Sequence, residues 1–193
     1  MAARLLARLR RPLIAVCGLA LMAGASACGR VLDPPTAENN GVYVEAGPIT
    51  YQLQVSRLLN QYATEDSQYV KGVSASARSL NSSQLWYGVF LWAKNQSNRS
   101  ARTTDNFDIV DTVGNHYYPV HLNTSLNPYA WTSQTLAPGG IQPGPDTPAS
   151  FGPTQGQLLL FKLNESVYSD RPLTLEIRSP TTGRVWGKIS LDL

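Results

Sequence analysis

Most of this chain consists of short segments with the alternation of β-strands, separated by turns that contain glycine or proline. In residues 51–56, for example, Tyr51, Leu53 and Val55 share one parity while polar residues occupy the other. A period of two places one face of a strand against a core and leaves the other face wet. Seven or eight such segments after residue 41, with almost no helical periodicity, predict an all-β sandwich or barrel of about seven to eight antiparallel strands, with one long loop rich in proline and glycine.

The turns between these segments predict how some of the strands pair. Gly114-Asn115 separates residues 107–111 from residues 116–120 and is a hairpin signal. Residues 179–183 join two further strand-like segments, 173–178 and 184–193. Residues 85–94 and 157–163 are apolar enough to be buried strands, whereas residues 58–83 are polar and serine-rich, with a short helix expected over residues 65–70.

The N-terminus has the order of features found in a signal peptide. Four arginines within residues 4–11 precede an apolar run over residues 12–25, which ends in Ala25-Ser26-Ala27. The run is shorter than the roughly 20 apolar residues that a permanent membrane-spanning helix needs. We therefore predict a signal peptide over residues 1–27 and export from the cytoplasm.

Cys28 follows the predicted cleavage site directly, and the segment resembles the bacterial lipobox, in which small residues precede a lipid-bearing cysteine. This resemblance implies an extracytoplasmic lipoprotein anchored to the membrane through Cys28. The alternative is ordinary cleavage and release of a secreted protein. Residues 28–41 are polar, contain two prolines and predict a flexible tether, so that the sandwich domain extends over residues 42–193.

Charge and cysteine content exclude some classes of function. Removing residues 1–27 takes away four arginines and no acidic residue, so 12 basic and 13 acidic residues remain, a net charge of −1. No basic stripe is left for a nucleic acid to bind. One remaining cysteine cannot form an internal disulfide, so the stability of the domain must come from its core. We also expect the domain to be monomeric.

Part of the chain resembles a family of secreted bacterial immunoglobulin-like domains of unknown function that are often found in lipoproteins. The matching features are the strand that ends at Asn95, the Phe107 strand with Gly114 and Tyr117, Pro138-Gly139, a strand that ends at Phe161, and Leu173 with Ile177. The resemblance covers residues 85–178, and residues 140–156 are an insert relative to the family. It implies an immunoglobulin-like sandwich and export, without implying an activity.

The serine, histidine and aspartate residues of this sequence do not form a recognisable catalytic or metal-binding pattern. There is no Gly-x-Ser-x-Gly, and His116 and His121 differ by five positions, which puts them on opposite faces of a strand. Asp105, Asp108 and Asp111 are also split between two faces, so a calcium site is only a minor alternative, and Asp111 is better explained as a turn residue. We expect no enzymatic activity, no cofactor and no metal.

The aromatic residues are the remaining candidates for a binding face. In residues 85–93 one parity is largely aliphatic, while the other carries Trp86, Phe90 and Trp92. If the aliphatic parity faces the core, three large aromatics lie on the outer face of a sheet. Either the loop of residues 122–156, with Tyr129 and Trp131, covers them, or these five residues form an exposed binding face.

The sequence thus predicts a non-enzymatic envelope lipoprotein that displays an immunoglobulin-like domain for protein–protein contact or envelope scaffolding. The alternative is a module that binds glycan, peptidoglycan or a small ligand through the exposed aromatic face. The expected partners are the membrane, through the anchor, and an unidentified envelope protein or glycan.

Overall fold

The computed structural model describes residues 35–191. The chain divides into two units, Met1–Asp33 and Pro34–Leu193, and the account below concerns the second. The predicted signal peptide and Cys28 lie outside the described residues.

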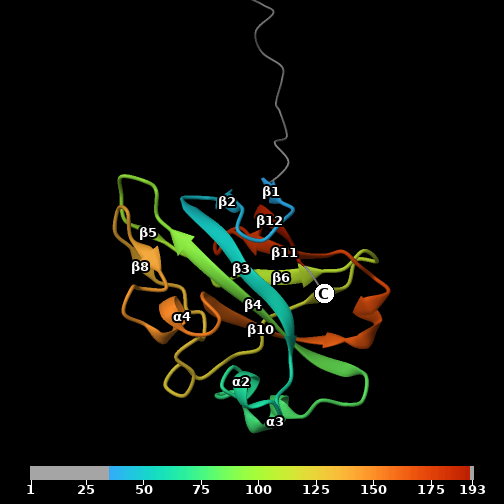
Figure 1. Cartoon of the computed structure of the whole chain (residues 1–193). Helices are drawn as coiled ribbons and strands as arrows, with labels where there is room; N and C mark the ends of the chain where they lie inside the picture. Colours follow the sequence, from blue (N-terminus) through green and yellow to red (C-terminus); the bar gives the residue numbers. More distant parts are fainter. Residues whose placement is uncertain (1–34, 192–193) are drawn as a thin grey trace, which may run out of the picture. The chain divides into compact units, whose positions relative to one another are not determined.

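The strands of the domain form two main sheets (Figure 1). The first sheet has the order β1 (Thr36–Ala37), β12 (Val185–Leu191), β11 (Leu173–Arg178), β6 (Phe107–Val110) and β7 (His116–Tyr117). The second has the order β10 (Gln157–Asn164), β4 (Gln84–Lys94), β3 (Ile49–Leu59) and β2 (Tyr43–Ala46), and β9 (Ile141–Gln142) pairs with the end of β4. β5 (Ala101–Arg102) and β8 (Thr135–Leu136) form a separate two-stranded ribbon.

The predicted all-β sandwich is confirmed. Between residues 35 and 191, seven strands are four residues or longer, and the helices are single turns: α2 (Thr64–Ser67), α3 (Ala75–Arg78), α4 (Pro148–Phe151) and the 3-10 turn η1 (Glu165–Tyr168). Both predicted hairpins are present, because β6 pairs with β7 and β11 pairs with β12 in antiparallel register. The finer, immunoglobulin-like assignment stays a prediction.

β1 differs from the prediction in two ways. It pairs with β12 in parallel, whereas only antiparallel strands were expected. It also lies within residues 28–41, the predicted tether, and yet Ala37 is buried in the core between the sheets. The folded domain therefore begins before Val42, because the chain contributes an edge strand before it reaches the first hairpin.

The main core fills the space between the two sheets. In β4 it takes Tyr87, Val89, Leu91 and Ala93, which is the inward parity that the sequence predicts. In β3, Tyr51 and Leu53 face the same core, but Val55 does not. A register irregularity between Leu53 and Val55 marks a β-bulge, which turns Val55 to the opposite face of the sheet.

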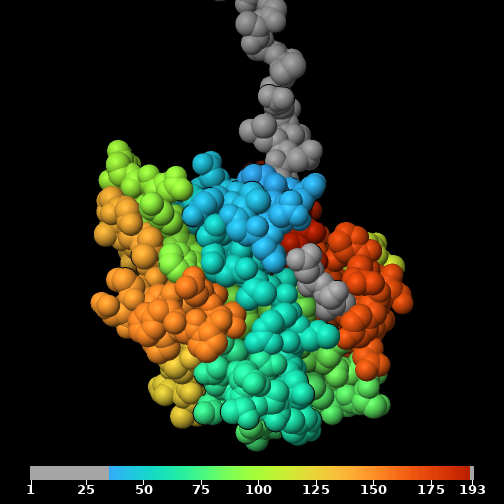
Figure 2. All heavy atoms as spheres, viewed as in Figure 1, coloured from blue at the N-terminus to red at the C-terminus, as the bar shows by residue number. Residues whose placement is uncertain are grey.

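A second, smaller core lies on the outer face of the second sheet. The segment between β3 and β4, which includes α2 and α3, covers one part of this face, and the long segment that precedes β10 covers another. Figure 2 shows the first of these segments as a layer, coloured teal to green, over the lower end of the domain. The core consists of Leu59, Tyr69, Val70, Val73, Trp86, Phe90, Leu122, Tyr129, Ala130, Ala149, Leu158 and Leu160.

Candidate functional site

Of the two alternatives for the aromatic residues, a covered face is the one that the structure shows for Trp86 and Phe90. Trp86 and Phe90 are 1% and 0% exposed, because the second core lies over them. The ring of Tyr69 meets that of Phe90 edge-on at 5.0 Å, and Nε1 of Trp86 lies 3.4 Å from Oε1 of Gln61. These side chains cannot present flat faces to a ligand, which corrects their assignment to a binding face.

Tyr129 and Trp131 both belong to the long loop of residues 122–156, but they pack against different cores. Tyr129 is buried in the second core, where its hydroxyl donates to Oε1 of Gln68 at 3.0 Å. Trp131 packs instead at the rim of the main core, with ring centroids 6.0 Å from Tyr51 and 5.5 Å from Phe107. The five aromatics are therefore divided among two cores and a groove.

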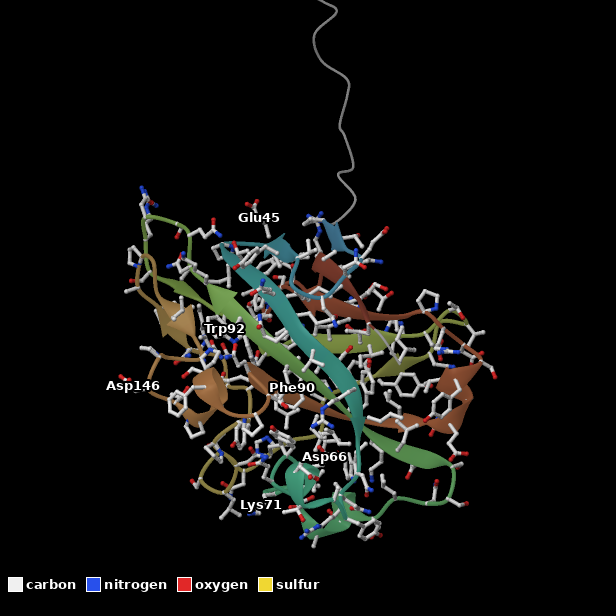
Figure 3. All side chains as sticks on the ribbon, viewed as in Figure 1. Glu45, Asp66, Lys71, Phe90, Trp92 and Asp146 are labelled. Carbon is white, nitrogen blue, oxygen red and sulfur yellow. The ribbon has the colours of Figure 1, made fainter. Side chains whose placement is uncertain are left out.

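Trp92, like Trp131, is only partly buried. It lines a groove of about 160 Å³ with Tyr43, Thr50, Gln52, Ala93, Lys94 and Ile141. Phe90 and Trp92 lie two residues apart on β4, and Figure 3 shows Trp92 further along the strand, towards the ribbon of β5 and β8. Its Nε1 is buried and has no hydrogen-bond partner among residues 35–191.

A larger cleft, of about 430 Å³, opens at the edge of β10 that faces away from β4. Its walls are the segments of residues 119–122 and 130–133, its floor is formed by Leu158, Leu159 and Leu160, and Arg102 and Asp105 stand at its rim. A second hollow, of about 830 Å³, shares His121, Leu122, Thr124 and Thr132 with it. This cleft combines an apolar floor with charged groups, which is the usual make-up of a ligand site.

Hydrogen bonds hold the walls of the cleft in place. Thr103 N–H donates to the carbonyl oxygen of Gln134 at 3.0 Å, and the Thr103 hydroxyl accepts a bond from Gln134 N–H at 2.9 Å. Nε1 of Trp131 donates to the carbonyl oxygen of Thr104 at 2.8 Å. The rim that carries Arg102 and Asp105 is thus tied to the wall that carries Trp131.

The three candidate carboxylates have separate surroundings, although strand parity separates only Asp108 from the other two. Asp111 accepts the N–H groups of Val113 and Asn115 at 3.1 and 2.8 Å, which confirms it as a turn residue. Burial alone would raise the pKa of Asp111, but bonds from the Asn115 side chain, the two N–H groups and the Tyr117 hydroxyl lower it below its usual value. Asp105 lies apart from both others, at the cleft.

Asp108 belongs to a charged cluster on the outer face of the first sheet. Its carboxylate is 1% exposed and contacts Nε of Arg178 and Nδ1 of His116, each at 2.5 Å. Arg178 also contacts Glu176, which in turn contacts Lys188 at 3.0 Å. The bond to Asp108 raises the pKa of Arg178. This cluster links β6, β11 and β12, so a structural role accounts for it.

Over residues 35–191, no group of three or more His, Cys, Asp or Glu side chains is arranged to hold a metal ion. In the same range no helix has the length and apolar character needed to cross a membrane.

Sequence reasoning did not identify the cleft as a site. Asp105 and His121 were considered only as metal ligands, and Arg102 was not singled out. The cleft depends on residues 119–133 returning to the edge of β10, a contact between distant segments for which the sequence holds no local pattern.

Comparisons with known proteins concern the fold. No protein-family model matches the sequence, and no curated protein matches it. Among solved structures, the yjhA protein of Bacillus subtilis is 13% identical, with a TM-score of 0.46 over 82% of this chain and 99% of its own. An uncharacterised β-sandwich protein of Clostridium difficile 630 is 11% identical, with a TM-score of 0.44 over 83% of this chain and 95% of its own.

A third structure, a Bacillus subtilis protein provisionally described as a lipoprotein (ycdA), is 10% identical, with a TM-score of 0.45 over 81% of this chain and 39% of its own. At these identities and scores the three structures say nothing about what this chain binds.

Proposed function

We propose that this protein is a non-enzymatic lipoprotein of the bacterial envelope, anchored through Cys28, whose sandwich domain contacts an envelope protein. The observation that carries the proposal is the order of the N-terminal features. A basic segment and an apolar run lead to Ala25-Ser26-Ala27, and Cys28 follows at the position where a lipobox needs its cysteine. The β-sandwich that follows supports the display of a folded domain outside the cytoplasmic membrane.

Replacing the predicted anchor tests the proposal directly. Cys28→Ala should move the protein from the membrane fraction to the soluble fraction, and the wild-type mass should exceed that of the polypeptide from Cys28 by two or three acyl chains. One chain binds a bilayer only reversibly, so stable anchoring needs more than one. Cys17→Ala is the matched control, because it removes the other cysteine from within the apolar run. A wild-type mass equal to the bare chain would refute the anchor.

A second candidate function is the binding of a small ligand by the domain. We propose it because of the cleft beside β10, with Arg102, Asp105 and His121 around an apolar floor. The cleft, and not the aromatic face of the sequence-based hypothesis, is the observation that favours this function. A small-ligand domain and a lipid anchor are compatible, so each hypothesis can be tested separately.

A further inference from the structure

The edge of β10 that faces away from β4 is hydrogen-bonded to two other segments of the chain, with a gap between them. Leu158 N–H donates to the carbonyl oxygen of Tyr129 at 2.7 Å, and Leu158 O accepts Trp131 N–H at 2.9 Å. Leu160 O accepts Val120 N–H at 2.7 Å. These bonds show that Leu158 and Leu160 direct their backbone groups away from β4, since N–H and C=O of alternate residues in a strand point to the same side.

Leu160 N–H therefore points towards the cleft. No hydrogen bond from it to any of residues 35–191 is found, and its other neighbour, β4, lies on the opposite side of the strand. Leu160 is 1% exposed and forms part of the cleft floor. A buried N–H without a protein acceptor is rare and costs free energy, so such a group usually binds a water molecule or a ligand oxygen.

The rim of the cleft adds one group of each charge. Nη2 of Arg102 donates to the carbonyl oxygen of Ser133 at 3.2 Å, which fixes the guanidinium beside the wall and leaves its other N–H groups available. Asp105 takes part in none of the ion pairs seen within residues 35–191, Arg102 included. An arginine and an aspartate that share a cleft without pairing are suited to a ligand that carries both charges.

Trp131 supplies the remaining recognition element. Its Nε1 is already bonded to Thr104 O, so the indole cannot donate to a ligand. Trp131 lines the cleft, however, and an indole ring attracts a cation placed over its face. The volume of about 430 Å³ is within the range of roughly 300–1,000 Å³ that small-molecule sites occupy.

From these contacts we propose that the cleft binds a small zwitterion, an amino acid or a short peptide with free termini. Its carboxylate accepts bonds from Leu160 N–H and the Arg102 guanidinium, and its ammonium group lies between Asp105 and the Trp131 ring. This inference rests on the small-ligand function proposed above and names its ligand class. It does not depend on Cys28.

The test is a titration of the ¹⁵N-labelled protein, purified in mild detergent, with glycine and with glycylglycine, followed by amide chemical shifts. The Leu160 resonance should shift and saturate below about 10 mM, which corresponds to a dissociation constant in the millimolar range or tighter. Arg102→Gln and Asp105→Asn should each raise that constant by about tenfold, because each removes a charge-assisted bond. Arg99→Gln and Asp146→Asn are matched controls that lie outside the cleft lining and should leave it within about twofold.

Each other result contradicts a defined part of the proposal. Saturable binding of N-acetylglycinamide, which has neither charge, with an equal constant would retain a small-ligand site and overturn the zwitterion. Equal loss of affinity in the cleft and control variants would overturn the assignment of the charged groups. If neither zwitterion shifts Leu160 at any concentration, the inference fails; if N-acetylglycinamide also leaves Leu160 unshifted, the N–H binds water only and the small-ligand function fails with it.

Discussion

The aromatic face of β4 is buried in the second core, so removing one of its side chains should lower the free energy of unfolding. Phe90→Ala should lower the free energy of unfolding by about 3–5 kcal/mol, the usual cost of emptying a buried aromatic site. Phe90 is fully buried and meets Tyr69 edge-on, so little can relax into the space. Phe151→Ala is the control, since Phe151 is 68% exposed and its loss should cost about 0.5 kcal/mol or less. Urea unfolding of both variants measures the difference, and equal values would contradict the second core.

At the residue scale, the sequence predicted parity well wherever a strand was regular. The aliphatic parity of β4 faces the main core, and Trp86 and Phe90 lie on the opposite face, as expected. Val55 was assigned to the wrong face of β3. A β-bulge inserts one extra residue into the strand and shifts the alternation after it, and nothing in the local sequence marks the bulge. Alternation along a strand shows on which face of the sheet a side chain lies, but it does not show whether another segment packs on that face. The exposure of the aromatic residues could therefore not be predicted from the sequence.

The junction before β10 determines how the long loop enters the second sheet. Gly156 has a φ of +104°, and a Cβ there would lie 2.9 Å from both Leu91 N and Phe90 C in β4. Gly156→Ala therefore adds a clash with backbone to a strained conformation, and we expect a loss of about 2–5 kcal/mol in unfolding free energy.

Gly114→Ala separates the two effects. Gly114 also has a positive φ, +88°, but nothing lies within 4 Å of the added Cβ, so only the strain of about 1–2 kcal/mol applies. Thermal unfolding of the two variants should rank Gly156→Ala as clearly less stable. A smaller effect at Gly156 than at Gly114 would mean that the loop does not enter β10 along this path.

The element that sequence reasoning missed is the cover between β3 and β4. Residues 58–83 are polar and serine-rich, yet four apolar residues among them enter the second core: Leu59 at the end of β3, and Tyr69, Val70 and Val73 in the cover itself. Their placement depends on the long loop, because Nδ2 of Asn127 donates to the carbonyl oxygens of Tyr69 and Lys71 at 2.9 and 3.0 Å. Three apolar residues give no helical or strand period, and a bond between segments 58 residues apart leaves no local pattern.

For the whole molecule, the position of β1 changes where the independent domain begins. The sequence suggested a start at Val42, but the Lys188 N–H donates to Pro35 O at 2.9 Å, Gly41 N–H donates to Leu53 O at 2.8 Å, and Ala37 is buried. These bonds join both sheets to residues 35–41. Removing the segment also leaves β12 as a new sheet edge, and an unpaired edge is a site of association with other chains.

We therefore expect the chain of residues 42–193 to be less stable than the chain of residues 35–193. The lost backbone bonds contribute about 0.5–1.5 kcal/mol each, so a difference of about 1–3 kcal/mol in unfolding free energy should result. Thermal unfolding measures the stability, and size-exclusion chromatography at two protein concentrations measures association through the exposed edge of β12. The longer chain should elute as a monomer at both concentrations, while the shorter one should shift to larger species at the higher concentration. Equal melting temperatures and elution volumes would show that residues 35–41 act as a tether, as the composition of that segment alone suggests, and that the pairing of β1 with β12 adds nothing to the stability of the sandwich.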